Sequence, residues 1–296
     1  MIKYSTLFIL LLLTACSAKQ NKSQESTIIF HSTRDSVAFN IYQLNPLTQK
    51  ITKLTDDTTW SYHPVWFGED EILYIKTIGE QEVMRHRLNI KTGDSAPHLP
   101  GLHPTVLMHS SPNGKYLSYH LEVGETTQIF TVNADGSEET QLTFDDEGNT
   151  QPRWSPDSEK ILFRSNRDGN PELYIMNRDG SNQVRITQSD SLDRYAEWSP
   201  SGDRIAFASK RDGADLEIYT MKPDGSDIVK LTDNDAEDGE LGWSPDGTQI
   251  VWKFRDQNTD NNHDIYIMNA DGSNKTRLTD HPAYDGFPTW GWLSKN

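Results

Sequence analysis

Short apolar segments alternate with polar turn sequences along nearly the whole chain. Segments such as 160–163, 173–176 and 184–187 are rich in β-branched and aromatic residues, which suit half-buried strands. Ser-Pro-Asp-Gly and Asp-Gly-Ser sequences separate these segments and favour tight turns. Beyond the N-terminal apolar run, no segment keeps a helical period of 3.6 residues. The pattern therefore predicts an all-β protein.

The predicted strands recur in groups of four. In the clearest copies, which begin at Trp154 and Trp198, the group starts at a Trp-Ser-Pro sequence, passes an Arg-Asp-Gly loop and an Asp-Gly-Ser turn, and ends in Leu-Thr or Ile-Thr. The other copies are weaker. Successive anchor residues are separated by 43 to 47 residues, an interval typical of propeller blades. The anchors are Trp66, His109, Trp154, Trp198, Trp243 and Trp290.

The two ends of the chain predict how the repeats close. Three strands, expected at 28–30, 41–44 and 51–54, precede the first anchor, and the strand missing from that group must come from residues 288–292. We therefore expect a six-bladed β-propeller with four antiparallel strands per blade, closed by the C-terminal strand completing the N-terminal blade. A linear solenoid is the competing architecture, and the matching half-blades at the two ends argue against it.

Residues that recur in most of the repeats are expected to serve the fold. The anchor tryptophans should fill the space between neighbouring blades. Four Arg-Asp pairs should tie adjacent blades together through charge-assisted hydrogen bonds or fix the loops that contain them. These pairs are Arg34-Asp35, Arg167-Asp168, Arg211-Asp212 and Arg255-Asp256.

The N-terminus has the features of an export signal: a basic start, a short apolar run and small residues before Cys16. Its Leu-Thr-Ala-Cys sequence resembles the lipobox of bacterial lipoproteins, in which the cysteine becomes the acylated N-terminus, with palmitate among the attached chains. This resemblance implies a signal peptide over 1–15, a lipidated Cys16 with a flexible tether over 16–26, and the propeller over 27–296. With Ser17 after the cysteine, it implies the outer membrane, facing the periplasm, of a Gram-negative cell. An ordinary signal peptide with a chance cysteine is the alternative.

Charge narrows the choice of partners. Asp and Glu outnumber Lys and Arg by 44 to 28, which makes the formal net charge −16. Such a surface repels nucleic acid, so we expect no nucleic-acid partner. Solubility alone would account for the charge, and it also suits cationic partners.

The repeat resembles that of the TolB propeller family, whose namesake works in the Tol–Pal system of the bacterial envelope. The Trp-Ser-Pro-Asp-Gly start, the Ser-x-Arg-Asp-Gly loop, the Ile-Tyr-x-Met strand and the Leu-Thr ending carry the resemblance over residues 27–296. The resemblance does not extend to the α/β domain that precedes the propeller in that family, so we expect the propeller alone. Similar repeats occur in prolyl oligopeptidase-type enzymes and oligogalacturonate lyases.

The long loops between fourth and first strands, and between second and third strands, should share one face and surround the channel mouth. They contain acidic runs, including 145–147 and 233–240, and aromatic residues that do not belong to the repeat. Such a face suits a basic or amphipathic peptide or a stacked sugar, unless the aromatic residues only plug the mouth. The candidate binding residues are Trp60, Tyr62, His63, Phe144, Arg194, Tyr195, Glu240, Tyr284 and Phe287.

Catalytic and metal signatures are weak. Asp256, Asn258 and Asp260 have the oxygen spacing of a calcium loop but lack its later ligands, so Ca²⁺ is a minor candidate and we expect no other cofactor. The chain contains no Gly-x-Ser-x-Gly sequence. We predict a monomeric, non-enzymatic envelope lipoprotein that binds a protein or peptide. The alternative is a lyase or hydrolase that acts on polysaccharide in the channel.

Overall fold

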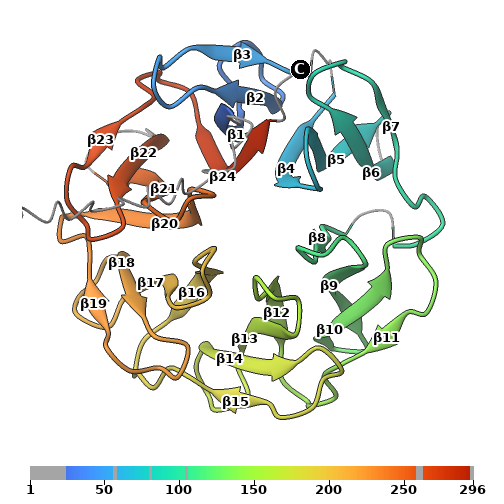
Figure 1. The fold of residues 1–296 in the computed structure, drawn as a ribbon, viewed down its shortest axis with the longest axis vertical. Coiled ribbons are helices and arrows are strands. Elements are labelled where there is room, and N and C mark those ends of the chain that lie inside the picture. The colour runs from blue at the N-terminus through green and yellow to red at the C-terminus, as the bar shows by residue number, and fades with distance from the viewer. Residues whose placement is uncertain (1–24, 56–58, 80–81, 104–105, 258–262, 294–296) are drawn as a thin grey trace, which may run out of the picture.

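The computed structural model describes residues 25–55, 59–79, 82–103, 106–257 and 263–293. These residues form six four-stranded antiparallel sheets arranged as blades around a central axis (Figure 1). The predicted fold class is therefore confirmed. Within these ranges, no helix has the length and apolar character needed to cross a membrane.

The strands follow the repeat blade by blade. Blade 1 contains β24 (Asp285–Leu293), β1 (Glu25–Ser32), β2 (Asn40–Leu44) and β3 (Ile51–Lys53). Blade 2 contains β4 (Ser61–Trp66), β5 (Glu71–Ile78), β6 (Glu82–Asn89) and β7 (Ser95–Pro97), and blade 3 contains β8 (His109–Ser110), β9 (Tyr116–Val123), β10 (Thr126–Asn133) and β11 (Thr140–Gln141). Blade 4 contains β12 (Asn149–Trp154), β13 (Lys160–Ser165), β14 (Glu172–Asn177) and β15 (Val184–Arg185). Blade 5 contains β16 (Asp193–Trp198), β17 (Ile205–Ser209), β18 (Glu217–Met221) and β19 (Val229–Lys230), and blade 6 contains β20 (Ala236–Trp243), β21 (Gln249–Asp256), β22 (His263–Asn269) and β23 (Thr276–Arg277).

The last strand closes the ring as predicted. β24 pairs antiparallel with β1, from Glu25 opposite Leu293 to Ser32 opposite Asp285. The first blade therefore combines both ends of the propeller (Figure 1). β1 begins at Glu25, two residues before the expected start of the propeller. The predicted signal peptide and Cys16 lie outside the described residues.

Anchor tryptophans pack between blades. Trp198 of blade 5 belongs to one buried cluster with Leu162 and Leu173 of blade 4. Indole N–H groups add contacts between blades, because Trp154 donates to the carbonyl of His109 (3.2 Å) and Trp243 donates to that of Glu197 (3.2 Å). The repeated tryptophans thus join neighbouring sheets.

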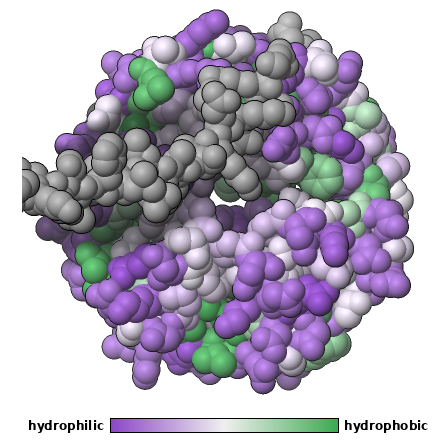
Figure 2. Space-filling model, viewed as in Figure 1, coloured by the Kyte–Doolittle hydropathy of each residue, from purple (hydrophilic) through white to green (hydrophobic). Residues whose placement is uncertain are grey.

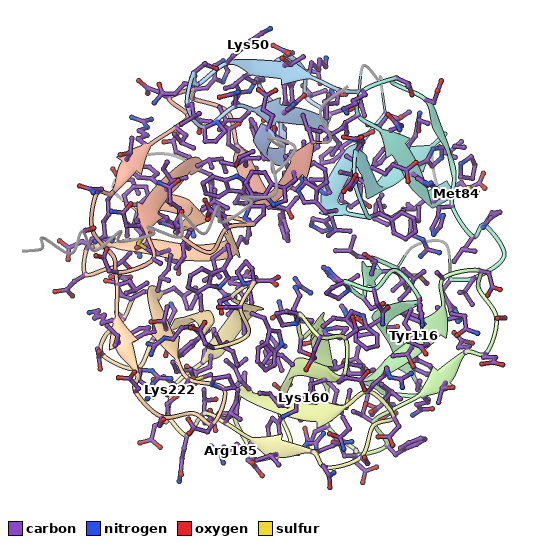
Figure 3. The ribbon with its side chains drawn as sticks, in the orientation of Figure 1. Lys50, Met84, Tyr116, Lys160, Arg185 and Lys222 are labelled. Carbon is purple, nitrogen blue, oxygen red and sulfur yellow. The ribbon has the colours of Figure 1, made fainter. Side chains whose placement is uncertain are left out.

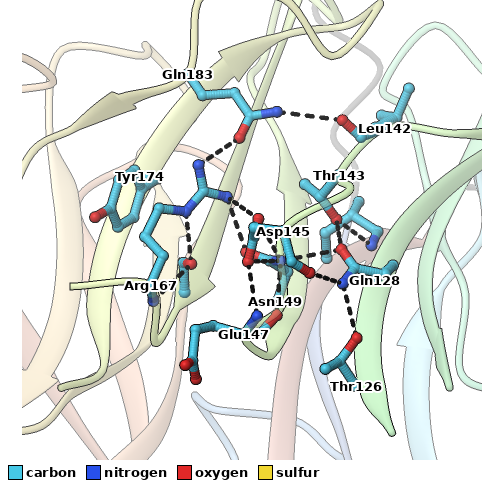
Figure 4. Close-up of polar contacts among 12 residues, drawn as sticks. Thr126, Gln128, Leu142, Thr143, Asp145, Glu147, Asn149, Arg167, Tyr174 and Gln183 are labelled. Carbon is cyan, nitrogen blue, oxygen red and sulfur yellow. Dashed lines mark hydrogen bonds and ion pairs between the residues drawn. The ribbon is translucent and has the colours of Figure 1, made fainter. Parts of the chain in front are cut away.

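A threonine latch explains the Leu-Thr ending of the repeat. In blade 3, the Thr143 hydroxyl donates to Gln128 Oε1 (2.6 Å) and accepts from the backbone N–H of Ile129 (2.9 Å), as Figure 4 shows in part. In blade 4, Thr187 bonds in the same way to Glu172 and to the N–H of Leu173. Since both partners lie at the start of the third strand, the latch fixes the fourth strand beside it. The latch residues are Thr55, Thr143, Thr187, Thr232 and Thr279.

Three of the Arg-Asp pairs fix the loop within their own blade. Arg211 bonds to Asp193 (3.0 Å), and its guanidinium lies 5.1 Å from the ring of Tyr219. The Tyr219 hydroxyl donates to Asp212 (2.8 Å). Arg34-Asp35 and Arg167-Asp168 repeat the arrangement with small changes, and Figure 4 shows Arg167 beside Asp145 and Asn149. Of the two predicted roles, loop fixation is therefore the one observed at these three pairs.

Blade 2 departs from the repeat because it has no threonine latch among its described residues. Arg85 of β6 is fully buried and donates to the carbonyl oxygens of Val106 (2.8 Å) and Leu102 (3.0 Å). Longer contacts reach the carbonyls of Leu99 and His103, both at 3.4 Å. One arginine therefore fixes the irregular connection to blade 3.

Candidate functional site

Five inner strands contain a β-bulge at the residue three positions before the anchor. The residue in the bulge has a positive φ although it is not glycine, a conformation that costs about 1–2 kcal/mol. Because the bulge interrupts the strand, it turns one side chain toward the central axis. These residues are His63 (52°), Gln151 (56°), Tyr195 (56°), Glu240 (49°) and Phe287 (51°).

The bulge residues line a cavity of about 1130 Å³ along the axis. The anchor tryptophans line it farther along the inner strands, together with Tyr62 and Val106. Figure 2 shows an opening at the centre of one face, and Figure 3 shows side chains that surround it while Lys50, Arg185 and Lys222 lie at the outer rim. Residues from all six blades contribute to the wall.

Five of the predicted binding residues form one aromatic cluster at the junction of blades 1, 2 and 6. The rings of His63 and Phe287 are 4.0 Å apart, and those of Tyr62 and His63 are 5.0 Å apart. Phe39 joins Trp60 (5.1 Å) to Tyr284 (5.3 Å). The structure therefore brings together residues that are more than two hundred positions apart in the sequence.

His31 lies at the centre of this cluster, and the sequence analysis missed it. Its ring stacks on Phe39 at 4.5 Å and lies 5.2 Å from Phe287. Its Nδ1 accepts from the backbone N–H of His63 (3.1 Å). Burial and the neighbouring His63 hold the pKa of His31 well below its usual value, and burial lowers the pKa of His63 to about 4. Both rings are therefore neutral at neutral pH.

Glu240 connects the aromatic cluster to blade 6. It forms an ion pair with Lys253, and its Oε2 accepts from the backbone N–H of Phe287 (2.9 Å). The Lys253 ammonium lies 5.6 Å from the ring of Tyr284. Gln151 makes the equivalent contact one third of the way round, where it accepts from the N–H of Tyr195 (3.3 Å). Two of the five bulge side chains, Glu240 and Gln151, thus accept a hydrogen bond from the backbone of the next bulge.

Tyr195 lines the cavity at blade 5, whereas its neighbour Arg194, also a predicted binding residue, is not among the lining residues. The Arg194 guanidinium lies 4.6 Å from the ring of Tyr195. Burial raises the pKa of the Tyr195 hydroxyl, and Glu240 adds to the effect while Arg194 and Arg164 oppose it. Arg164, on the second strand of blade 4, was not predicted as a site residue.

Farther along the wall, a polar chain crosses three blades. Arg153 of blade 4 contacts His109 Nε2 (2.7 Å) of blade 3 and forms an ion pair with Glu197 of blade 5. Burial raises the pKa of Glu197, and Arg153 opposes this effect. His109, which replaces tryptophan at its anchor position, therefore has a polar partner inside the channel.

Two parts of the predicted loop face need correction. Phe144 is 75% exposed and does not line the cavity, because it lies in the loop after β11. Asp238 belongs to the acidic run 233–240 that was predicted at the mouth, but its side chain is buried, as are those of Asp193 and Asp285. They occupy the same position in blades 5, 6 and 1, five residues before the anchor, and bond to Arg211, Trp252 and Arg34.

The calcium candidate stays a prediction. Asp256 ends β21, while Asn258 and Asp260 lie outside the described residues. Among the residues that the structure describes, no three His, Cys, Asp or Glu side chains are grouped so that they could hold a metal ion.

Two solved structures share this architecture. TolB from Acinetobacter baumannii superimposes with a TM-score of 0.76 at 18% identity, covering 90% of this chain and 66% of that chain. An oligogalacturonate lyase in complex with manganese superimposes with a TM-score of 0.57 at 17% identity, covering 85% of this chain and 73% of that chain. At these identities, both comparisons concern the fold alone.

Sequence comparisons agree with the repeat. An uncharacterized peptidase of Bacillus subtilis (strain 168), YuxL, is 33% identical over 95 residues, which are 30% of this chain and 14% of the peptidase. This chain thus matches only a small part of that relative and just under two thirds of the Acinetobacter protein. Residues 106–213 match the family model for the TolB beta propeller domain. The chain is therefore a TolB-like six-bladed β-propeller.

Proposed function

We propose that this propeller is a non-enzymatic module that binds a peptide segment of an envelope protein in its central cavity. One observation carries the proposal: a repeated backbone bulge presents different side chains to a single cavity. A backbone feature that recurs around the ring serves the fold, whereas side chains that differ at that feature are available for recognition.

The size and the wall of the cavity support a peptide ligand. Small-molecule sites usually measure about 300–1,000 Å³, so a volume of about 1130 Å³ can take several side chains. Aromatic rings supply large contact areas at low entropic cost. The neutral His63 adds a ring without charge to the wall, and the buried His31 beside it is also neutral. The aromatic cluster thus suits an apolar residue of the peptide.

The predicted lipid anchor completes the proposal. Cys16 would hold the propeller at the membrane, in the periplasm and on the outer membrane if the cell is Gram-negative. We propose that the protein acts there as a monomer. Replacing Cys16 with Ser should move the protein from the membrane fraction to the soluble fraction of the cell envelope, whereas an ordinary signal peptide would leave the distribution unchanged.

A crosslinking experiment tests the binding face. Wild-type protein and the Tyr62→Ala/Tyr195→Ala variant would be crosslinked in intact envelopes and their partners identified by mass spectrometry. Phe144→Ala is the matched control, because Phe144 is an exposed aromatic residue outside the cavity. We expect the control to keep the wild-type partners and the double variant to lose them. Unchanged partners in the double variant would contradict the proposal.

The enzymatic alternative has one comparison in its favour, the shared fold with a manganese-bound oligogalacturonate lyase. Metal analysis of the purified protein and a polysaccharide panel, with and without chelator, test it. Stoichiometric Mn²⁺ or Zn²⁺ together with chelator-sensitive cleavage would favour a lyase or hydrolase over the binding module.

A further inference from the structure

Two arginines beside the cavity lack the partners that other arginines have. Arg153, Arg167 and Arg211, which lie nearby, each pair with a carboxylate. The same holds for the other arginines of the described residues, apart from Arg85, which bonds to backbone carbonyls. Within that part of the chain, Arg164 and Arg194 form no ion pair.

These two arginines come from adjacent blades, Arg164 on β13 and Arg194 on β16. Thr150 lies opposite Arg164, and the next residue, Gln151, accepts a hydrogen bond from the backbone N–H of Tyr195, the residue after Arg194 (3.3 Å). The Arg194 guanidinium lies 4.6 Å from the Tyr195 ring. Burial and the charge of Arg194 lower the pKa of Arg164, which agrees with this arrangement. Gln151 and Tyr195 both line the cavity, so the two arginines lie next to its wall.

Three of the buried polar groups without a hydrogen-bond partner lie at this place. Among the described residues, the Nε groups of Arg164 and Arg194 and the Thr150 hydroxyl are buried without a partner. Thr150 lies directly opposite Arg164 on the neighbouring strand. Buried polar groups without partners cost free energy, so a ligand that accepts hydrogen bonds here would bind favourably.

The carboxylates that could neutralise the pair already have other partners. Glu237 pairs with Lys210 (3.3 Å) and Arg255 (3.2 Å), and Glu240 pairs with Lys253. Two positive charges therefore remain uncompensated beside the cavity of a chain whose net charge is −16.

We propose that Arg164 and Arg194 bind a carboxylate of the peptide ligand. This inference rests on the proposed function and deepens it. A guanidinium offers parallel N–H donors that match the two oxygens of a carboxylate. An apolar neighbour of that carboxylate would then reach the aromatic cluster across the cavity. The carboxylate would come from the C-terminus of the partner or from an Asp or Glu side chain.

A titration with succinate tests the anion site without any peptide. The Nε–H signals of Arg164 and Arg194 would be followed by NMR in the purified protein, with Arg204 as an internal control because it pairs with Asp227 (2.6 Å) away from the cavity. We expect saturable shifts of the first two signals only, and about tenfold weaker binding in Arg164→Gln. The absence of a saturable shift would overturn the carboxylate site.

Capture of synthetic peptides then identifies the source of the carboxylate. Three pools of short random peptides would be used: free C-terminus without Asp or Glu, amidated C-terminus without Asp or Glu, and amidated C-terminus with Asp and Glu. The proposal would be supported if the protein retained the first or the third pool more strongly than the second. This preference should be lost in Arg164→Gln and Arg194→Gln and kept in Arg204→Gln. Folding of each variant would be checked by circular dichroism.

The remaining outcomes separate this inference from the proposed function. Equal retention of all three pools, unchanged in the variants, would leave the peptide-binding function intact and overturn the carboxylate site. Succinate binding with no peptide retained would overturn both the peptide ligand and the proposed function. A parallel pool of uronic-acid oligosaccharides, retained where no peptide is, would assign the site to a saccharide and likewise overturn the peptide proposal.

Discussion

At the scale of single residues, the central cluster depends on histidines that remain neutral. His63 has a positive φ and lies against Phe287, while His31 is buried beneath both. Protonation would place a positive charge among aromatic rings and near Lys253, which already lowers the pKa of His31. Stability should therefore decrease in acid through these groups.

His63→Phe tests this effect. The unfolded-state pKa of a histidine is about 6.5, while burial lowers the folded-state pKa of His63 to about 4. A lowered folded-state pKa means that stability is present above pH 6.5 and is lost as the pH falls toward 4. By pH 5 the loss from His63 should reach roughly 2 kcal/mol relative to neutral pH.

Urea unfolding at neutral pH and at pH 5 measures the effect. The free energy of unfolding of the wild type should fall by roughly 2 kcal/mol more than that of His63→Phe. Phe is a suitable replacement because Phe287 occupies the equivalent position in blade 1 with a similar φ. Equal decreases for the two proteins would show that His63 titrates normally in the folded state.

At the scale of the strands, each blade depends on polar contacts that fix its outer edge. The fourth strands have only two or three residues, so backbone pairing contributes little. The threonine latch compensates, because its hydroxyl joins the end of the fourth strand to the start of the third. In blade 4, its carboxylate partner Glu172 is completely buried.

Thr187→Val should destabilise the protein by about 2–4 kcal/mol. The substitution leaves the N–H of Leu173 and one oxygen of buried Glu172 without their partner. Thr276→Val is the matched control, since Thr276 is exposed and bonds only to a carbonyl (3.2 Å). The control should change stability by less than about 0.5 kcal/mol in chemical denaturation. Similar losses in both variants would rule out the latch.

Arg85→Met should loosen the connection between blades 2 and 3. Carbonyl groups at Val106 and Leu102 would lose their donor, at a cost of about 3 kcal/mol. Hydrogen exchange should accelerate first at the amide groups of these two residues. Arg87→Met, in the same strand, removes a half-exposed side chain and should leave exchange there unchanged. Slow exchange in Arg85→Met would mean that the segment is held by other contacts.

At the scale of the whole molecule, stability depends on the joint where the two ends meet. β24 pairs with β1 and also packs on blade 2, where the Trp66 ring lies against the backbone of Gly291. A Cβ atom at Gly291 would fall 2.2 Å from that ring. Glycine is therefore required there by close approach of the two blades.

Gly291→Ala should reduce the free energy of unfolding by about 2–3 kcal/mol. The midpoint of a single cooperative unfolding transition should fall accordingly. Gly213→Ala is the control, since a Cβ atom there meets nothing within 4 Å. The control should be neutral or slightly stabilising. A wild-type midpoint in Gly291→Ala, measured by circular dichroism on heating, would show that the joint can shift without cost.

The ring was predictable from the sequence because its repeats carry the fold. The non-repeated residues His63, Tyr195, Glu240 and Phe287 all line the cavity, and their role in binding stays a prediction. The acidic face was overestimated because Asp193 and its equivalents recur five residues before the anchors and are buried structural groups. His31 and Arg164 were missed because they lie within regular strands. Only the packing of adjacent blades reveals their neighbours.

The left-handed bulges have a consequence for how such a protein can change. Each of these residues is held by its own strand, and its side chain extends into space shared with the other blades. Exchanging Tyr195 or Phe287 should therefore alter selectivity while the scaffold stays intact, whereas Gln151 and Glu240 also bond to the backbone of the next bulge. Variation at these few positions offers an economical route to new specificities, by natural divergence or in a designed library.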